Sequence, residues 1–490
     1  MKNKRKNDRR EAASGFLWRF SERILAQGTA FAVSVILARI LQPSLYGTIA
    51  LVTVFTSILQ VFVDSGMGNA LIQKKDADNL DFSSVFYFNI ASCLLLYALM
   101  FAAAPLIAAF YGMAELTPVV RVLSLTLVIS GVKNVQQAYV SRNLLFRKFF
   151  FATLGGTLGA AGIGIYLAWK GYGVWALVAQ FLFNDMVDTI ILWITVPWRP
   201  KRLFSAQRLR GLLSFGWKLL AVSLISTLSN SLRSLIIGKR YTKEDLAYYN
   251  RGQQFPQIIA LNVDTAIDSI LLPTMSQEQD KLDVVLRMTR KAIRIETYVM
   301  MPMMMGLAVC SRALISLLIT DKWLPCVPYL QILCVIYAFY SVSTTKYNAY
   351  KSIGRSDVYL KMTTITSFVD ILILLASMPY GVMAIALGGL ASAAFNHLAN
   401  AVASKQLFCY RYRDQLMDLI PNSLLSLAMG AAVYAVFWLH LPTYLTLAVQ
   451  VILGVVLYVL LSRLFHVESF DYMLGMLRRE APVYDGKESV

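Results

Sequence analysis

The sequence predicts an all-α polytopic membrane protein with about fourteen transmembrane helices, in two six-helix bundles followed by two further helices. Of its 490 residues, 57% are hydrophobic and only 15% are charged, and the mean hydropathy is +0.57. Soluble domains are about one quarter charged, so this chain has too little polar surface for a soluble fold. Its apolar runs are long and do not alternate, as from Val85 to Phe110, which argues against a β-barrel.

Each membrane-spanning helix needs about 20 mostly apolar residues. Windows of that length are separated along this chain by short charged or turn-forming segments. The predicted spans are 17–39, 46–68, 83–109, 118–139, 149–169, 174–195, 213–237, 247–272, 295–318, 328–349, 358–379, 382–403, 420–440 and 444–464.

The net charge of +18 reflects topology. Lys and Arg gather in the N-terminus and in every second loop, as the positive-inside rule requires, which places both termini in the cytoplasm and argues against a nucleic-acid partner. The basic start, Met1 to Arg10, precedes an apolar stretch from Phe16 to Ile40. That stretch is long, contains Glu22 and Arg23 and lacks a clear cleavage site, so we expect a retained first span and no signal peptide.

Two segments of the chain have similar sequences. Phe16-Leu17-Trp18-Arg19 opens the first span and Phe215-Gly216-Trp217-Lys218 opens the seventh, so the bundles are expected to be parallel repeats, as in transporters that rock one half against the other. The predicted parts are a basic N-terminus 1–16, a first bundle 17–196, a basic linker 197–212, a second bundle 213–403, two additional helices 404–464 and a cytoplasmic tail 465–490.

Enzyme signatures are missing from the sequence. It has no phosphate-binding loop of the G-x-x-x-x-G-K-[ST] type, no H-E-x-x-H and no C-x-x-C pair. We therefore predict no catalytic activity, metal site, disulfide framework or cofactor. The glycines Gly155, Gly156, Gly159 and Gly162 have the spacing that lets membrane helices approach closely.

Ionisable and amide side chains inside spans are the informative residues, because a charge at the bilayer centre needs a partner, water or the interface. They gather in spans 1, 2, 7 and 8, which predicts a central polar cavity. Helical spacing puts Ser226, Asn230 and Arg233 on one face, and Asn250, Gln254 and Gln257 on another.

Simpler roles stay open for several of these groups. Arginine side chains near span ends also reach the interface by snorkelling, which applies to Arg23, Arg39, Arg233 and Arg251. Aspartates near the inner face also cap helices or pair with loop arginines, which applies to Asp64, Asp264 and Asp268. Glu22 next to Arg23 also makes a self-neutralising pair.

The sequence resembles the polysaccharide transport family of the multidrug/oligosaccharidyl-lipid/polysaccharide exporter (MOP) superfamily, in particular the colanic-acid and teichuronic-acid type of flippase. Seven short motifs carry the resemblance, in order and over nearly the whole chain. They are Leu41-x-Pro43-x-x-Tyr46-Gly47, Asp64-x-Gly66 with Ala70-Leu71-Ile72-Gln73, Gly171-Tyr172-Gly173-Val174-Trp175-Ala176-Leu177-Val178, Tyr249-Asn250-Arg251 with Pro256, Leu272-Pro273-x-x-Ser276, Trp323-Leu324-Pro325-x-Val327-Pro328 and Gly354-Arg355-x-Asp357. One departure is Lys243-Glu244-Asp245-Leu246-Ala247, where relatives often have a glycine-proline turn.

The resemblance implies a flippase of the bacterial cytoplasmic membrane that moves a polyprenyl-diphosphate oligosaccharide outward for cell-surface polysaccharide synthesis. Arginine suits a diphosphate and amides suit sugar hydroxyls. We therefore predict diphosphate contacts at Arg23, Arg233 and Arg251, and sugar contacts at Gln27, Asn230, Asn250, Gln254 and Gln257. Glu22, Asp64 and Asp264 are the candidates for coupling to H+ or Na+. Expected partners are the lipid-linked oligosaccharide, the bilayer, and a polysaccharide polymerase or export machinery.

Three alternative functions remain at this point. A multidrug-cation antiporter shares the fold but needs a cavity dominated by carboxylates. A membrane-embedded glycosyltransferase or polymerase usually needs a large outer loop, and the longest predicted one is short. If the protein is instead a scaffold for an envelope assembly complex, charge-neutral substitutions of Arg233 should have no effect.

Overall fold

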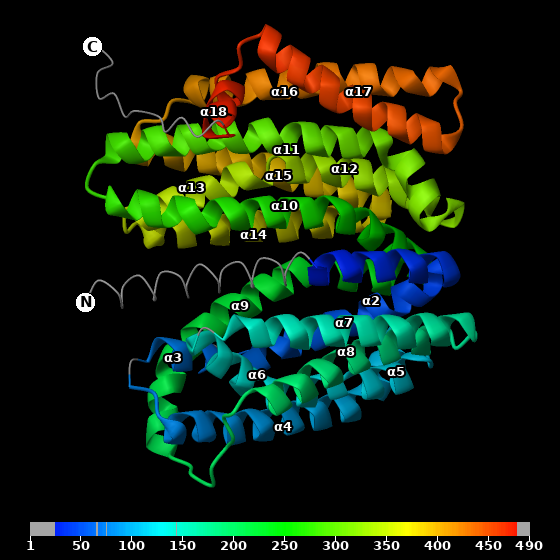
Figure 1. The fold of residues 1–490 in the computed structure, drawn as a ribbon, viewed down its shortest axis with the longest axis vertical. Coiled ribbons are helices and arrows are strands. Elements are labelled where there is room, and N and C mark those ends of the chain that lie inside the picture. The colour runs from blue at the N-terminus through cyan, green and yellow to red at the C-terminus, as the bar shows by residue number, and fades with distance from the viewer. Residues whose placement is uncertain (1–24, 65–66, 75, 144, 478–490) are drawn as a thin grey trace. The chain divides into compact units, whose positions relative to one another are not determined.

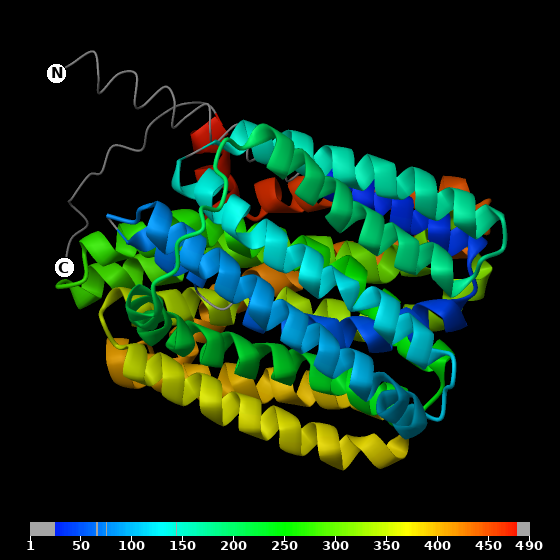
Figure 2. The same ribbon diagram turned by 90° about the horizontal axis from the view of Figure 1, so that it is seen from below.

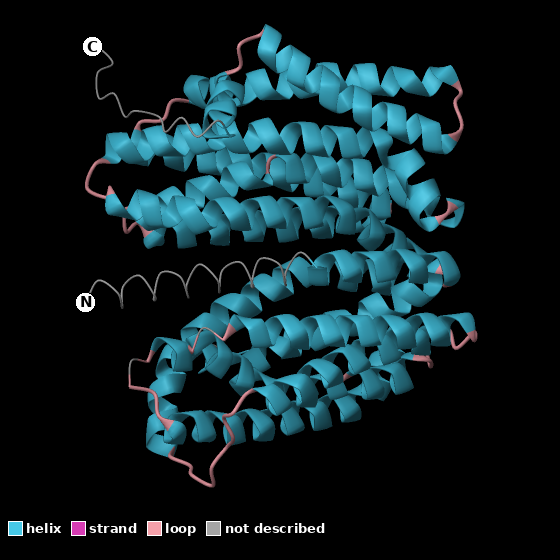
Figure 3. Ribbon diagram, in the orientation of Figure 1, coloured by secondary structure: helices cyan, strands magenta, loops and turns pink. Residues whose placement is uncertain are grey.

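The computed structural model describes residues 25–64, 67–74, 76–143 and 145–477. Helices account for nearly all of these residues and short loops join them, with no strand in the described ranges (Figure 3). Twelve helices are long and apolar enough to cross a membrane, and each coincides with a predicted span. The other two predicted spans, 17–39 and 213–237, fall on the helix Leu25–Ile40 and on α9, which are helical but not among those twelve.

The chain divides into two compact units, one ending at Ala247 and the other beginning at Tyr248. Within each unit the long helices run alongside one another, as two views of the ribbon show (Figures 1 and 2). The predicted parts 17–196, 197–212 and 213–403 stay a prediction about how these helices group. The all-α membrane fold itself is confirmed.

The N-terminal unit contains the helix Leu25–Ile40 and eight labelled helices. Their bounds are α2 Pro43–Asp64, α3 Met67–Gln73, α4 Asn79–Tyr111, α5 Leu116–Leu123, α6 Leu125–Arg142, α7 Phe146–Trp169, α8 Val174–Thr195 and α9 Ala206–Arg240. The α5 and α6 helices together make one span.

Local sequence explains where α4 begins and ends. The side chain of Asp78 accepts hydrogen bonds from the backbone N–H groups of Leu80 and Asp81, and Asp81 bonds back to the Asp78 N–H, which is a capping box. Gly112 ends the helix at φ 68°, a left-handed conformation that glycine adopts without a Cβ penalty. Arg208 of α9 lies 2.7 Å from the Asp78 carboxylate, and this hydrogen bond lowers the pKa of Asp78 to about 2.

Glycines set the packing of α7 on α8. A Cβ on Gly155 would lie 2.7 Å from Ile191, and one on Gly159 would lie 2.7 Å from the Phe183 ring. A Cβ on Gly156 would lie 2.9 Å from the Asn184 carbonyl oxygen, whereas one on Gly162 would meet open space. The predicted packing role is therefore confirmed for three of the four glycines.

The connector between α8 and α9 is held against its own unit. The Trp198 ring packs against the Phe82 ring at a centroid distance of 5.8 Å. The backbone carbonyl of Trp198 accepts a hydrogen bond from the Gln136 amide. The backbone N–H groups of Lys201 and Ser205 donate to serine hydroxyls at the start of α4, at 3.0 and 2.9 Å. This segment lies within the basic linker predicted at 197–212.

The C-terminal unit contains α10 through α18. Their bounds are α10 Lys243–Gln277, α11 Leu282–Ile319, η1 Asp321–Cys326, α12 Val327–Ala338, α13 Tyr340–Ser352, α14 Ser356–Ser377, η2 Met378–Tyr380, α15 Val382–Phe408, α16 Tyr412–Ala435, η3 Val436–Leu439, α17 Thr443–Leu464 and α18 Glu468–Leu477. The α10 helix begins at Lys243, in the N-terminal unit.

One ionic cluster joins α11, α16 and α18. The Asp418 carboxylate, whose side chain is fully buried, accepts from Arg290 Nε at 2.7 Å and from Arg294 Nε at 2.7 Å. It also accepts from the Tyr410 hydroxyl, and Arg294 makes a second ion pair with Glu468. Because two arginines on α11 bind one carboxylate on α16, this cluster ties the first of the two additional helices predicted at 404–464 to α11.

Candidate functional site

A polar cavity of about 810 Å³ lies inside the N-terminal unit. Its volume falls in the range of about 300 to 1,000 Å³ that is usual for small-molecule sites. Its walls come from α2, α5, α6, α8 and α9. The lining residues are Thr53, Thr56, Ser57, Gln60, Val61, Asp64, Leu123, Thr126, Ser130, Lys133, Asn134, Gln137, Phe181, Asp185 and Thr227.

Two helix faces explain why these side chains converge. On α2 the lining positions recur at intervals of three and four residues from Thr53 to Asp64, which is one face of an α-helix. On α6 the same spacing runs from Thr126 to Gln137. Hydroxyl and amide groups on both faces give the cavity a lining that hydrocarbon lipids cannot solvate, so it suits a polar ligand.

The threonine hydroxyls on α2 use their protons within the helix. Thr53 donates to the Ala50 carbonyl at 3.0 Å and Thr56 donates to the Thr53 carbonyl at 3.1 Å. A hydroxyl oxygen that has donated still accepts. These groups therefore offer acceptor positions to a ligand rich in hydroxyl donors.

Asp64 lies at one end of the α2 face and links it to α6. Its Oδ1 accepts from Gln60 Nε2 at 3.1 Å and from Asn134 Nδ2 at 3.1 Å. Among the predicted site residues that the structure describes, this ion-coupling candidate is the one that lines the cavity. Its two amide partners keep it oriented, and Lys133 of the same cavity interacts with it electrostatically.

Lys133 supplies the cationic group of the cavity wall. Its Nζ lies 2.8 Å from Asp185 Oδ1 and 3.1 Å from Asp188 Oδ2, and its side chain is only 12% exposed. A buried ammonium needs such partners because desolvation penalises the charge. An ammonium has three N–H donors, so two carboxylates fix its position and leave one donor for a ligand.

The other predicted site residues occupy several places. Arg23 and Glu22 lie outside the described residues. In the N-terminal unit Gln27 and Asn230 are exposed and Arg233 is half-buried on α9, and none of the three lines the cavity. Their roles stay predictions.

The remaining predicted residues lie on α10, in the C-terminal unit. Arg251 is buried; its Nη1 donates to Gln254 Oε1 at 2.7 Å and its guanidinium lies 4.9 Å from the centre of the Trp323 ring. Asn250 and Gln257 are half-buried on the same helix. Asp264 is also buried, and its Oδ2 accepts from the Thr344 hydroxyl at 3.2 Å.

Sequence reasoning missed the polar face of α6 and its partners on α8. The spacing of Thr126, Ser130, Lys133 and Gln137 carried the same helical signal as the faces that were recognised. A lysine in one apolar span and two aspartates in another also predict an ion pair between spans.

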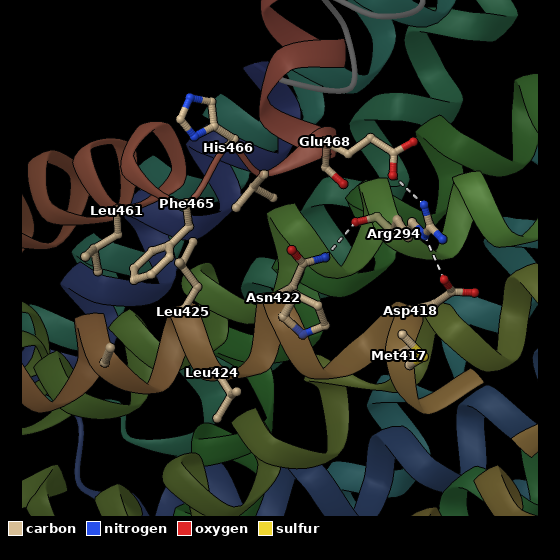
Figure 4. A pocket seen from close by; sticks show the side chains of 14 residues that line it. Arg294, Met417, Asp418, Asn422, Leu424, Leu425, Leu461, Phe465, His466 and Glu468 are labelled. Carbon is tan, nitrogen blue, oxygen red and sulfur yellow. Dashed lines mark hydrogen bonds and ion pairs between the residues drawn. The ribbon is translucent and has the colours of Figure 1, made fainter. Parts of the chain in front are cut away.

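A second cavity, of about 610 Å³, lies between α16, α17 and α18 in the C-terminal unit (Figure 4). Its walls are mainly apolar, with Leu424, Leu461 and Phe465 among them. Its charged lining residues, Arg294, Asp418 and Glu468, form ion pairs with one another, as the dashed lines in Figure 4 show. The N-terminal cavity is therefore the better candidate for a polar ligand.

Comparison with known proteins identifies the family. The family model described as "Polysaccharide biosynthesis protein" matches residues 36–328. The chain belongs to this family.

Curated members of the same group are distant in sequence. The chain is 23% identical to the lipopolysaccharide biosynthesis protein WzxC of Escherichia coli, over 92% of this chain and 89% of that protein. It is 24% identical to the succinoglycan biosynthesis transport protein ExoT of Rhizobium meliloti, over 68% of this chain and 67% of ExoT. The match to the teichuronic acid biosynthesis protein TuaB of Bacillus subtilis, at 26% identity, spans 57% of this chain and 59% of TuaB.

Solved structures confirm the fold. The lipid II flippase MurJ, in an inward closed conformation, superposes with a TM-score of 0.76 at 17% identity, over 93% of this chain and 99% of MurJ. A MATE-family multidrug transporter of the MOP superfamily superposes with a TM-score of 0.58 at 17% identity, over 80% of this chain and 98% of the transporter.

Proposed function

We propose that this chain is a flippase that carries a polyprenyl-diphosphate-linked oligosaccharide across the bacterial cytoplasmic membrane by alternating access. Family membership, the transport name of ExoT and the MurJ-like fold support a transporter of lipid-linked saccharides. The reaction makes and breaks no covalent bond. Both termini lie in the cytoplasm under this proposal, because the basic loops then face inward.

The polar cavity of the N-terminal unit is the observation that carries the proposal. Moving a sugar-diphosphate head group through hydrocarbon unaided is prohibitive, because each unpaired polar group costs several kcal/mol. The amide and hydroxyl groups on α2 and α6 replace water around sugar hydroxyls, and Lys133 supplies a cation for phosphate. Phe181 adds an aromatic wall against which the apolar face of a sugar ring packs.

Lys133 is the residue that we expect to bind the diphosphate. Its ammonium is held in place by Asp185 and Asp188, so little side-chain entropy is lost when a phosphate oxygen binds. Hydrogen bonds to charged groups contribute about 1.5–3 kcal/mol each. Loss of this one interaction should therefore reduce transport by about 10- to 100-fold at limiting substrate.

The test is reconstitution into vesicles with a labelled polyprenyl-diphosphate oligosaccharide, followed by measurement of the label that reaches the far leaflet. Lys133→Gln should lose most of the activity, and Gln137→Leu should lose part of it because one wall amide is removed without breaking an ion pair. Lys170→Gln is the matched control, since Lys170 lies exposed at the turn between α7 and α8. Native protein that moves no more label than empty vesicles would refute the proposal.

A multidrug-cation exporter is the second candidate, because two carboxylates, Asp64 and Asp185, line the same cavity. That function predicts that the vesicles accumulate a cationic dye and that Lys133→Gln increases accumulation by removing a positive charge. The flippase proposal predicts no dye accumulation. A polysaccharide polymerase or export machinery is the expected partner that consumes the transported saccharide.

A further inference from the structure

Three carboxyl groups of the C-terminal unit accept hydrogen bonds from α13. Asp264 and Asp268 are four residues apart on α10, and they accept from Thr344 and Asn348, which are four residues apart on α13. The third carboxyl group, Glu296 on α11, lies beside the Thr345 hydroxyl. Because residues four apart share a helix face, α10 and α13 meet along a matched polar face.

Glu296 is the most deeply buried of the three, with 2% of its surface exposed. Among the described residues no lysine, arginine or histidine makes an ion pair with it. The acidic groups that act on it electrostatically are Asp264 and Asp268, which add negative charge. An ionised carboxylate without a cation is costly in a low-dielectric interior, whereas the protonated acid is neutral.

The basic groups on the surrounding helices make no ion pair with Glu296 in the described part of the chain. On α13, Lys346 donates to Gln415 Oε1 at 2.9 Å, and Lys351, which lies 4.6 Å from the Tyr359 ring centre, also interacts electrostatically with Asp268. Arg290 and Arg294 of α11 bind Asp418 of α16, and Arg294 also binds Glu468 of α18. On α15, His397 lies edge-on to the Phe339 ring of the α12–α13 junction. The Tyr337 hydroxyl on α12 accepts a hydrogen bond from the Gln253 amide. The Tyr458 hydroxyl on α17 donates to the Tyr298 carbonyl.

The contact between Thr345 and Glu296 suits a protonated carboxyl group. Thr345 Oγ1 lies 2.5 Å from Glu296 Oε1 and 2.6 Å from Glu296 Oε2. In a neutral acid, Thr345 donates its one hydroxyl proton to one oxygen and the acid O–H donates back to Thr345 Oγ1. An ionised carboxylate has to share that single hydroxyl proton between both oxygens.

An open acceptor lies in the same cluster. Asp264 is 7% exposed, and its Oδ1 is buried without a hydrogen-bond partner while its Oδ2 accepts from Thr344. A buried acceptor of this kind is normally satisfied by a donor. A water that donates to Oδ1 satisfies this acceptor, and the same water can transfer a proton to the carboxylate, which removes its buried negative charge.

We propose that Glu296 and Asp264 form a proton-binding site whose loading and release drive transport by the flippase. Each carboxylate takes a proton from hydronium and leaves water, and the reverse step returns it, so no other reactant is needed. In the described part of the chain no three His, Cys, Asp or Glu side chains are placed to hold a metal ion, and the sodium condition of the test below separates Na+ from H+. This inference rests on the proposed function.

The test measures the distribution of labelled polyprenyl-diphosphate oligosaccharide between leaflets in three conditions: no gradient, a pH gradient of one unit, and a sodium gradient at equal pH. For native protein the pH gradient should shift the distribution by up to about tenfold for each proton carried per cycle, since one unit is a tenfold ratio of proton activity. Glu296→Gln keeps the shape of the neutral acid but cannot release a proton, so it should equilibrate the label without responding to pH. Glu278→Gln is the matched control, at an exposed site where Glu278 pairs with Lys281 at 2.9 Å.

Thr345→Val is the second variant, in case Glu296→Gln does not fold, and it should weaken the pH response because it removes the hydroxyl partner. A native response to sodium but not to pH overturns the inference, as does a full pH response in Glu296→Gln or, where that variant does not fold, in Thr345→Val. Native protein that equilibrates label with no response to either gradient overturns it too, and leaves the flippase function standing. If native protein moves no label in any condition, the proposed function fails and this inference fails with it.

Discussion

The substitution Asp418→Asn should strongly destabilise the C-terminal unit. The Asp418 side chain is fully buried and accepts from two arginines and a tyrosine. An asparagine there loses the negative charge and turns an NH2 group toward guanidinium donors. Breaking a buried ion pair from one side costs about 3–5 kcal/mol. Because the side chains of Arg290 and Arg294 are 32% and 35% exposed, water replaces part of the lost interaction, and we expect the lower end, about 3 kcal/mol.

The assay is unfolding of the purified protein in mixed micelles, with the free energy of unfolding extrapolated to zero denaturant. Asp283→Asn is the control, because Asp283 makes an exposed pair with Arg287 at 2.8 Å, with both side chains more than two-thirds exposed. Such surface pairs contribute about 0–1 kcal/mol. A loss below about 1 kcal/mol for Asp418→Asn, or a loss equal to that of the control, would show that the cluster does not hold α16 to α11.

Two further predictions concern the N-terminal unit. Gly47→Ala should destabilise it by about 1–3 kcal/mol in the same unfolding assay, because the new Cβ overlaps the backbone carbonyl of Lys243, which cannot rotate away. Gly162→Ala is the control, because its new Cβ meets open space on the helix α7; it should cost less, and the reverse order would contradict the packing argument. Arg208→Ala should raise the pKa of Asp78 from about 2 toward its ordinary value. Since the native pKa is lowered, the stability from this pair is present above about pH 4 and is lost as the pH falls toward 2, so melting temperatures of native and variant should differ at pH 6 and converge near pH 2.

Hydropathy and loop charge were enough to predict the membrane class and the positions of the twelve apolar spans, because burial in lipid demands long apolar helices whatever their neighbours. The site was predicted only in part. Asp64 was recognised because a charge in a span is conspicuous on its own. Lys133 and Asp185 were not, since their meaning depends on α6 lying against α8. Glu296 was missed because it follows four basic residues and resembles part of a charged inner loop.

The attachment of the α8–α9 connector has a practical consequence. Its backbone is hydrogen-bonded to α4 and its tryptophan is buried in an aromatic cluster. The connector is therefore fixed to its own unit by non-covalent contacts and is not a flexible linker. A protease site placed near Arg202, which is exposed, should yield two fragments that copurify without a peptide bond between them. Split-protein fusions and crosslinking tags inserted at that point should then report on an assembled transporter.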